Sequence, residues 1–220
     1  MHIELKEYKN ILFDLDGTII DPKEGITNSV KNALDYFGIN VEDEKDLYKF
    51  IGPPLYETFP KYYNFNEEET ILAVEKFREY FRVKGILENV LYDGIEELLK
   101  RLEESGKNIM LATSKGTIFA EQILKNYKID KFFTFIGGSE FNGTRIKKAE
   151  VIQYVLEQNK ISDLSTVVMI GDREHDIIGA KEIGIDSIGV LYGYGDYEEL
   201  SKAGATYIVR DVAELNEKLL

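Results

Sequence analysis

The chain has 220 residues, of which 44% are hydrophobic, and a formal net charge of −13. This length fits one large domain or a main domain with a smaller insert, and the apolar content excludes an intrinsically disordered chain. There is no cysteine, which excludes disulfides and thiolate metal sites and suits a reducing compartment, so we expect a cytoplasmic protein. The acidic charge argues against nucleic acid as a partner, and no apolar stretch approaches the roughly 18 residues that a membrane span needs.

The first element is an apolar run at residues 11–13 that leads directly into Asp14 and Asp16. The run predicts a buried strand, and residues two apart in an extended chain face the same way, so both carboxylates should emerge together where the strand ends. Adjacent carboxylates repel unless a cation or a proton is shared, and a hard divalent metal prefers oxygen ligands. The alternative is an ordinary turn, because Asp and the following Gly17 are both turn residues.

The segment 21–90 contains helical patterns but no strand-like run. Apolar residues at helical spacing predict one helix over 26–37, which ends at Gly38. Asn66 followed by Glu69 predicts the capped start of another helix. We therefore expect an all-helical domain that is inserted into a core domain formed by 1–20 and 91–220.

From residue 108 onward, short apolar runs alternate with amphipathic stretches. This alternation is typical of βαβ units and predicts an α/β fold with a parallel sheet that helices cover on both faces. Such sheets bind ligands beyond the carboxyl ends of their strands, where polar residues or glycine follow several of these runs. The expected strands are 109–112, 133–136, 167–170, 187–190 and 207–209, and helices are expected over 118–125 and 151–157.

Four motifs occur in order along the chain, each at an expected strand end or loop. They are the acidic run from Asp14 to Thr18, Thr113 after the next core strand, a lysine at 147 or 148, and Gly171-Asp172 with Asp176 four residues on. Together they resemble the haloacid dehalogenase-like hydrolases, specifically phosphatases with a helical cap such as the phosphoglycolate phosphatase and 5'-nucleotidase-like members. The resemblance covers essentially the full chain. It implies a Rossmann-like parallel sheet core with an inserted all-helical cap.

The motif lysine departs from the pattern of the family. Many family members place Pro directly after this lysine, whereas here Lys147 and Lys148 are adjacent and Ala149 follows. The spacing to the apolar positions Val151 and Ile152 favours Lys148, with Lys147 as the alternative.

The resemblance implies a Mg²⁺-dependent phosphatase that acts on a small phosphate ester. Asp14 would be the nucleophile that forms an aspartyl-phosphate, and Asp16 would protonate the leaving group and then activate water. Mg²⁺ would be held by Asp14, the backbone carbonyl of Asp16, and Asp172. The remaining implied site residues are Thr113, Ser114, Lys148 and Gly17 toward the phosphoryl group, and Asp176 as a further acidic contact.

Plainer interpretations exist for several of these residues. Thr113 or Ser114 could simply cap a helix that begins near Thr117, and residues 171–176 could be a turn and helix start where acidic groups favour the helix dipole. The glycine-rich stretch 189–195 could border the site or be a flexible loop.

Three functions from different classes remain open on sequence alone. The leading one is a phosphatase, which we expect to be a monomer, with phosphoglycolate or a nucleoside 5'-monophosphate as substrate. A phosphomutase would keep the same motifs, and a catalytically idle binding protein could share the fold. A dehalogenase is disfavoured, because halide displacement does not require the second carboxylate, Asp16.

Overall fold

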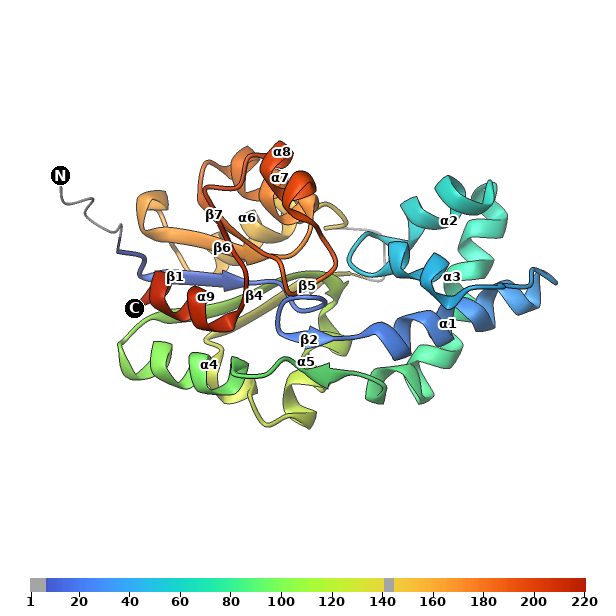
Figure 1. Cartoon of the computed structure of the whole chain (residues 1–220), viewed down its shortest axis with the longest axis horizontal. Coiled ribbons are helices and arrows are strands. Elements are labelled where there is room, and N and C mark those ends of the chain that lie inside the picture. Colours follow the sequence, from blue (N-terminus) through green and yellow to red (C-terminus); the bar gives the residue numbers. More distant parts are fainter. Residues whose placement is uncertain (1–6, 141–144) are drawn as a thin grey trace. The chain divides into compact units, whose positions relative to one another are not determined.

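The computed structural model describes residues 7–140 and 145–220 (Figure 1). The chain divides into two compact units: one combines the chain up to Ile19 with the chain from Leu91 onward, and the other is Ile20–Val90. Two short strands, β2 (Ile20–Asp21) and β3 (Val90–Leu91), pair with each other where the chain passes between the units. Within the described residues, no helix has both the length and the apolar character needed to cross a membrane.

The first unit contains a six-stranded parallel sheet in the order β5-β4-β1-β6-β7-β8. Strand β1 lies in its interior, and Phe13 is in register with Leu111 on one side and Ile170 on the other. Central parallel strands are buried on both faces, which is why the last three residues of β1, 11–13, are apolar and buried. After β1 the chain adds β4 and β5 on one side of it, and then crosses over to add β6, β7 and β8 on the other side. The carboxyl end of β1 is therefore a topological switch point. The strands are β1 (Asn10–Phe13), β4 (Asn108–Gly116), β5 (Phe135–Ser139), β6 (Val167–Gly171), β7 (Asp186–Val190) and β8 (Tyr207–Val209).

Helices cover both faces of this sheet, which confirms the predicted α/β fold. In Figure 1, α6 and α7 lie on one face and α4, α5 and α9 on the other. On the first face, the strand residues Leu12, Met110 and Met169 form a buried cluster with Val151 and Val155 of α6. The helices of this unit are α4 (Ile95–Glu104), α5 (Thr117–Asn126), α6 (Lys148–Gln158), α7 (Glu174–Ile183), α8 (Tyr197–Ala203) and α9 (Val212–Leu219).

Two strands differ from their predicted limits. The predicted strand 133–136 was wrong at both ends, because β5 begins at Phe135 and continues through two glycines to Ser139. Those glycines permit close packing and do not end the strand: a Cβ on Gly138 would lie 2.4 Å from the carbonyl oxygen of Lys115. Strand β4 continues past its apolar run to Gly116. Its register against β5 shifts there, because Ala112 pairs with Gly137 and Gly116 with Ser139, so that three residues of β4, 113–115, lie opposite the single residue Gly138.

The second unit has its own core and is helical between β2 and β3. Asn66 and Glu69 form the predicted capping box, with both backbone-to-side-chain hydrogen bonds at 2.9 Å. Helix α2 was not predicted, and Pro60 lies inside it, a residue that normally interrupts helices. The elements are α1 (Lys23–Tyr36), a 3-10 helix (Glu44–Phe50), α2 (Leu55–Tyr63), α3 (Glu67–Val83) and a 3-10 turn (Gly85–Leu87).

Candidate active site

The first acidic motif follows β1 directly, at the carboxyl edge of the sheet. Asp14 continues the sheet pairing through its backbone N–H, which donates to the carbonyl of Ile170 at 2.9 Å. Asp14 and Asp16 are 4% and 7% exposed. Between them and the next helix, Gly17 has φ +80°, and a Cβ there would lie 2.1 Å from Asp172 Oδ2. The turn therefore requires glycine both for its left-handed backbone and for the close approach of Asp172.

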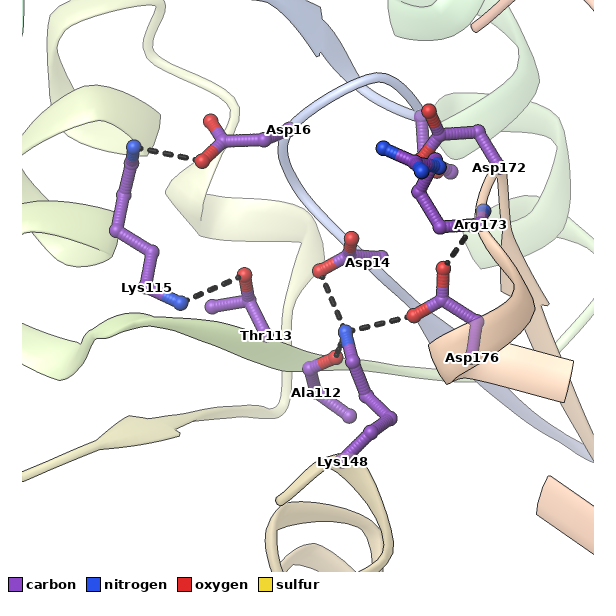
Figure 2. A network of polar contacts seen from close by, with 10 residues as sticks. Asp14, Asp16, Ala112, Thr113, Lys115, Lys148, Asp172, Arg173 and Asp176 are labelled. Carbon is purple, nitrogen blue, oxygen red and sulfur yellow. Dashed lines mark hydrogen bonds and ion pairs between the residues drawn. The ribbon is translucent and has the colours of Figure 1, made fainter. Parts of the chain in front are cut away.

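Lys148 lies between two of the acidic motifs (Figure 2). Its Nζ is 2.8 Å from Asp14 Oδ1 and 2.7 Å from Asp176 Oδ1, and it donates to the carbonyl of Ala112 at 3.1 Å. All three donors of the ammonium group thus have an acceptor. Burial by itself would lower the pKa of Lys148, but the adjacent carboxylates outweigh it and raise that pKa above its ordinary value. Lys147, by contrast, is exposed at the N-cap of α6.

The last motif combines a helix cap with a site residue. Asp176 Oδ2 accepts the backbone N–H of Arg173 at 3.1 Å, as in a capping box of α7, while its Oδ1 faces Lys148. Asp172 is fully buried, and its Oδ2 accepts the backbone N–H of Tyr194 at 2.8 Å. One oxygen of Asp176 therefore caps α7, as the helix-start interpretation of 171–176 predicts. The other oxygen of Asp176 contacts Lys148, and Asp172 does not take part in the cap.

The glycine-rich stretch after β7 borders Asp172. A Cβ on Gly193 would lie 2.4 Å from both Asp172 Cβ and the carbonyl oxygen of Gly17. The hydroxyl of Tyr192 donates to the carbonyl of Thr18 at 2.9 Å. This stretch thus holds the Asp172 side chain against the turn that follows β1, and it is part of the site.

The shifted end of β4 carries the polar residues Thr113, Ser114 and Lys115. Thr113 is buried and Ser114 half-buried. Neither caps a helix, because α5 begins at Thr117 after Gly116 without a side-chain cap. Lys115 was missed by the sequence analysis, yet its Nζ is 2.7 Å from Asp16 Oδ2. The available signal was its position two residues after Thr113, which in an extended chain points to the same face.

The charges of this site are unbalanced. Four buried carboxylates, those of Asp14, Asp16, Asp172 and Asp176, face two nearly buried ammonium groups, those of Lys115 and Lys148. Burial, then the charges of Asp176 and Asp14, raise the pKa of Asp172 well above its ordinary value. Burial also raises the pKa of Asp16, with Lys115 opposing that shift. Among the described residues, the carboxylates of this cluster therefore outnumber its ammonium groups by two.

A divalent cation would supply the missing charge. One carboxylate oxygen each from Asp14, Asp172 and Asp176 lies within 4.8 Å of the others, which is a donor set that could hold a metal ion. Carboxylate oxygens are the ligands that Mg²⁺ prefers. The residues therefore fit the metal implied by the sequence motifs, and Asp176, expected as a further acidic contact, supplies one oxygen of this donor set.

A parallel sheet with a buried acid cluster at its switch point, and a helical unit inserted after the first strand, defines a hydrolase of the haloacid dehalogenase-like type. A family model described as haloacid dehalogenase-like hydrolase matches residues 11–190. The chain belongs to this family, which confirms the resemblance drawn from the four motifs.

Relatives with named activities extend this assignment. The chain is 45% identical to a 5'-nucleotidase from Pseudomonas aeruginosa over 96% of each chain, and 25% identical to a phosphoglycolate phosphatase from Vibrio parahaemolyticus over 96% of each. It is 34% identical to tyrosine-protein kinase PtkA from Mycobacterium tuberculosis, over 95% of this chain and 72% of the kinase. The crystal structure of a predicted phosphatase from Clostridium acetobutylicum shares 49% identity and a TM-score of 0.95, and covers 97% of this chain and 98% of that one. The chain is thus a phosphatase-type member of its family.

Proposed function

We propose that this protein is a Mg²⁺-dependent phosphatase that hydrolyses a small phosphate monoester through an aspartyl-phosphate on Asp14. The observation that carries the proposal is the contact of Lys148 with both Asp14 and Asp176, beside the three-carboxylate cluster that fits a metal. A phosphoryl group brings negative charge, and its transfer is catalysed mainly by positioning and by cations. This site provides a buried nucleophile and a fixed ammonium group at the same place.

In the first step, a carboxylate oxygen of Asp14 forms a bond to phosphorus as the bond from phosphorus to the leaving oxygen breaks. Asp16 gives its proton to the leaving oxygen, which departs as an alcohol. Lys148 neutralises charge on the transferred group and holds Asp14, and the Thr113 hydroxyl, with the backbones of Ser114 and Gly17, contacts the phosphoryl oxygens.

In the second step, Asp16 takes a proton from water as the water oxygen attacks phosphorus. The bond from Asp14 to phosphorus breaks, which restores the carboxylate and releases inorganic phosphate. Bound Mg²⁺, held by Asp14, Asp172 and the Asp16 carbonyl with Asp176 beside them, would neutralise the phosphoryl oxygens.

For the substrate, we propose a nucleoside 5'-monophosphate first and phosphoglycolate second. The order follows the relatives, because the protein named 5'-nucleotidase is 45% identical and the one named phosphoglycolate phosphatase is 25% identical. We further propose that 21–90 acts as a cap that selects the substrate and excludes water from the nucleophile. We also propose a cytoplasmic monomer that uses neither nucleic acid nor a membrane as a partner. The acidic charge disfavours nucleic acid, and the lack of cysteine suits a reducing compartment.

The test is phosphate release from a panel of phosphate monoesters, with Mg²⁺ and with EDTA. We expect Mg²⁺-dependent release that is lost in Asp14→Asn, with Asp35→Asn, an exposed acid on α1, as the matched control. Conversion of one hexose phosphate isomer into another, with little phosphate released, would instead establish a phosphomutase. No reaction with any ester would favour an idle binding protein.

A further inference from the structure

Lys115 and Asp16 form a second ion pair in the site, separate from the contacts of Lys148. The distance from Lys115 Nζ to Asp16 Oδ2 is 2.7 Å, and the two side chains are only 8% and 10% exposed. The other oxygen of this carboxylate, Asp16 Oδ1, is buried and has no hydrogen-bond partner among the described residues. One oxygen of Asp16 is therefore fixed by a cation, while the other is left for a ligand or a proton.

An irregularity at the end of β4 positions Lys115 for this ion pair. Residues 113–115 face Gly138 alone, and such irregularities of a strand re-aim side chains next to active sites. Gly138 permits the arrangement, because a Cβ there would lie 2.4 Å from the carbonyl oxygen of Lys115. The backbone N–H of Lys115 also donates to the Thr113 hydroxyl at 3.3 Å, which ties the two residues together (Figure 2).

The two buried lysines contact different carboxylates. Lys148 reaches Asp14 and Asp176, whereas Lys115 reaches Asp16. Asp14 is the nucleophile in the proposed function, and Asp16 is the group that moves protons. The division suggests that each lysine serves one of the two chemical roles.

We propose that Lys115 is a positioning residue that holds Asp16 Oδ2 so that Asp16 Oδ1 exchanges the proton with the leaving oxygen and then with water. Lys115 stays protonated throughout and forms no bond to phosphorus. The ammonium group also stabilises the carboxylate that Asp16 becomes once it has protonated the leaving group. This inference rests on the proposed phosphatase function and goes beyond it by assigning the second lysine.

Two substrates of similar shape separate this role from phosphoryl binding. p-Nitrophenyl phosphate has a leaving group that departs readily without a proton, whereas benzyl phosphate releases an alkoxide that needs one. The value of kcat/KM reports the steps up to departure of the leaving group, so it isolates the first proton transfer from the hydrolysis of the intermediate.

We expect Lys115→Met to lower kcat/KM for benzyl phosphate by about 100-fold, within the range that general acid–base catalysis contributes, and for p-nitrophenyl phosphate by less than about fivefold. For benzyl phosphate the loss should lie in kcat, with KM changed by less than about threefold. Lys115→Arg, which keeps the charge, should recover part of the loss. Mg²⁺ binding, followed by the metal-induced rise in melting temperature, should match wild type.

The matched control is Lys107→Met. Lys107 precedes the same strand at its other end, its side chain is 10% exposed, and it also pairs with a carboxylate, that of Glu7 at 3.6 Å. We expect wild-type kinetics with both substrates from this variant, provided it remains folded by circular dichroism.

Several results would overturn the inference. Equal losses with both substrates would make Lys115 a phosphoryl-binding group, and a loss of Mg²⁺ binding would make it a structural support of the acid cluster. Unchanged kinetics in Lys115→Met would remove any role in the reaction while leaving the phosphatase proposal intact. Absence of turnover by the wild-type protein would overturn the phosphatase proposal and this inference together.

Discussion

The two edges of the same parallel sheet carry two different kinds of polar network. At the amino edge, Asn108 donates to Asn10 Oδ1 and Asn10 donates to the Thr166 hydroxyl, both at 3.0 Å, and the Thr134 hydroxyl donates to Asn108 Oδ1. These groups are neutral, and each donor shown has an acceptor. At the carboxyl edge, the same strands lead into carboxylates that outnumber the lysines between them.

This difference separates stability from chemistry. A satisfied neutral network fixes the register of neighbouring strands, while a buried network that is short of cations costs folding free energy and is typical of functional sites. Substitutions at the amino edge should therefore change stability without changing the reaction, and substitutions at the carboxyl edge should do the reverse unless they remove a cation.

The largest expected effect is that of Asp14→Asn on catalysis. We expect kcat to fall by at least about 10³-fold, because an amide cannot replace the carboxylate nucleophile. The melting temperature should change little, because Lys148 keeps its ion pair with Asp176 and the site loses one of its surplus carboxylates. A clear loss of stability together with retained turnover would reverse the contrast between the two edges.

Lys148→Met should affect stability and catalysis together. Removing one partner of a buried ion pair leaves uncompensated charge and costs about 3–5 kcal/mol in the free energy of unfolding. The measurement is urea unfolding of the metal-free protein, with phosphate release as the second readout. Lys147→Met is the neighbouring control, and since its side chain is exposed we expect a change within about 0.5 kcal/mol.

Metal binding should depend on pH in a defined direction. Because burial raises the pKa of Asp172 and of Asp176 in the folded protein, the folded state keeps protons that the unfolded state releases. The metal-free protein should therefore lose stability as pH rises from the ordinary carboxyl range, about pH 4, through the raised values. Mg²⁺ requires the deprotonated ligands, so it should stabilise the protein more at about pH 8 than at about pH 5.5.

The size of that stabilisation follows from mass action. At a free Mg²⁺ concentration of 100 times Kd, we expect about 2.7 kcal/mol, read as a rise in melting temperature over an EDTA-treated sample. Asp172→Asn should weaken both the Mg²⁺ effect and its pH dependence. An equal Mg²⁺ effect at both pH values would contradict the assignment of these carboxylates as ligands.

The smallest effect is expected at the amino edge. Asn108→Ala removes hydrogen bonds to Asn10 and Thr134 and should cost about 1–2 kcal/mol in the free energy of unfolding, with kcat unchanged. Asn126→Ala, an exposed residue at the end of α5, is the control for the loss of an amide. A change in kcat at Asn108 would show that the two edges are coupled.

Much of the core sheet could be predicted from the sequence because its strands are short, apolar and separated by helical patterns. The run 207–209 coincides with β8, and 167–170 falls one residue short of β6. The limits of β5 could not be predicted, since Gly138 lies in that strand because of a backbone approach from Lys115, which no local pattern records.

The acidic residues of the site could be predicted from the sequence for a similar reason. Asp14, Asp16 and Asp172 follow apolar runs that end at one edge, so strand periodicity alone brings them together. For Lys115, the spacing of two from Thr113 indicates a shared face, but the register shift of β4 beside it appears only once β5 is paired, so its contact with Asp16 could not be predicted. The choice of Lys148 over Lys147 could be made from the spacing to Val151 and Ile152, and the structure places Lys148, the first residue of α6, beside Asp14 and Asp176.

The close packing around Asp172 has a consequence for how this enzyme family is read from sequence. The methyl group of an alanine at Gly17 or Gly193 would occupy the space that the Asp172 side chain fills. A chain could thus retain every acid and every lysine of the site and still lose its activity through one added carbon atom. An inventory of charged residues alone would score such a chain as an intact enzyme, so the glycines that line the acid belong in any signature used to separate active members from silent ones.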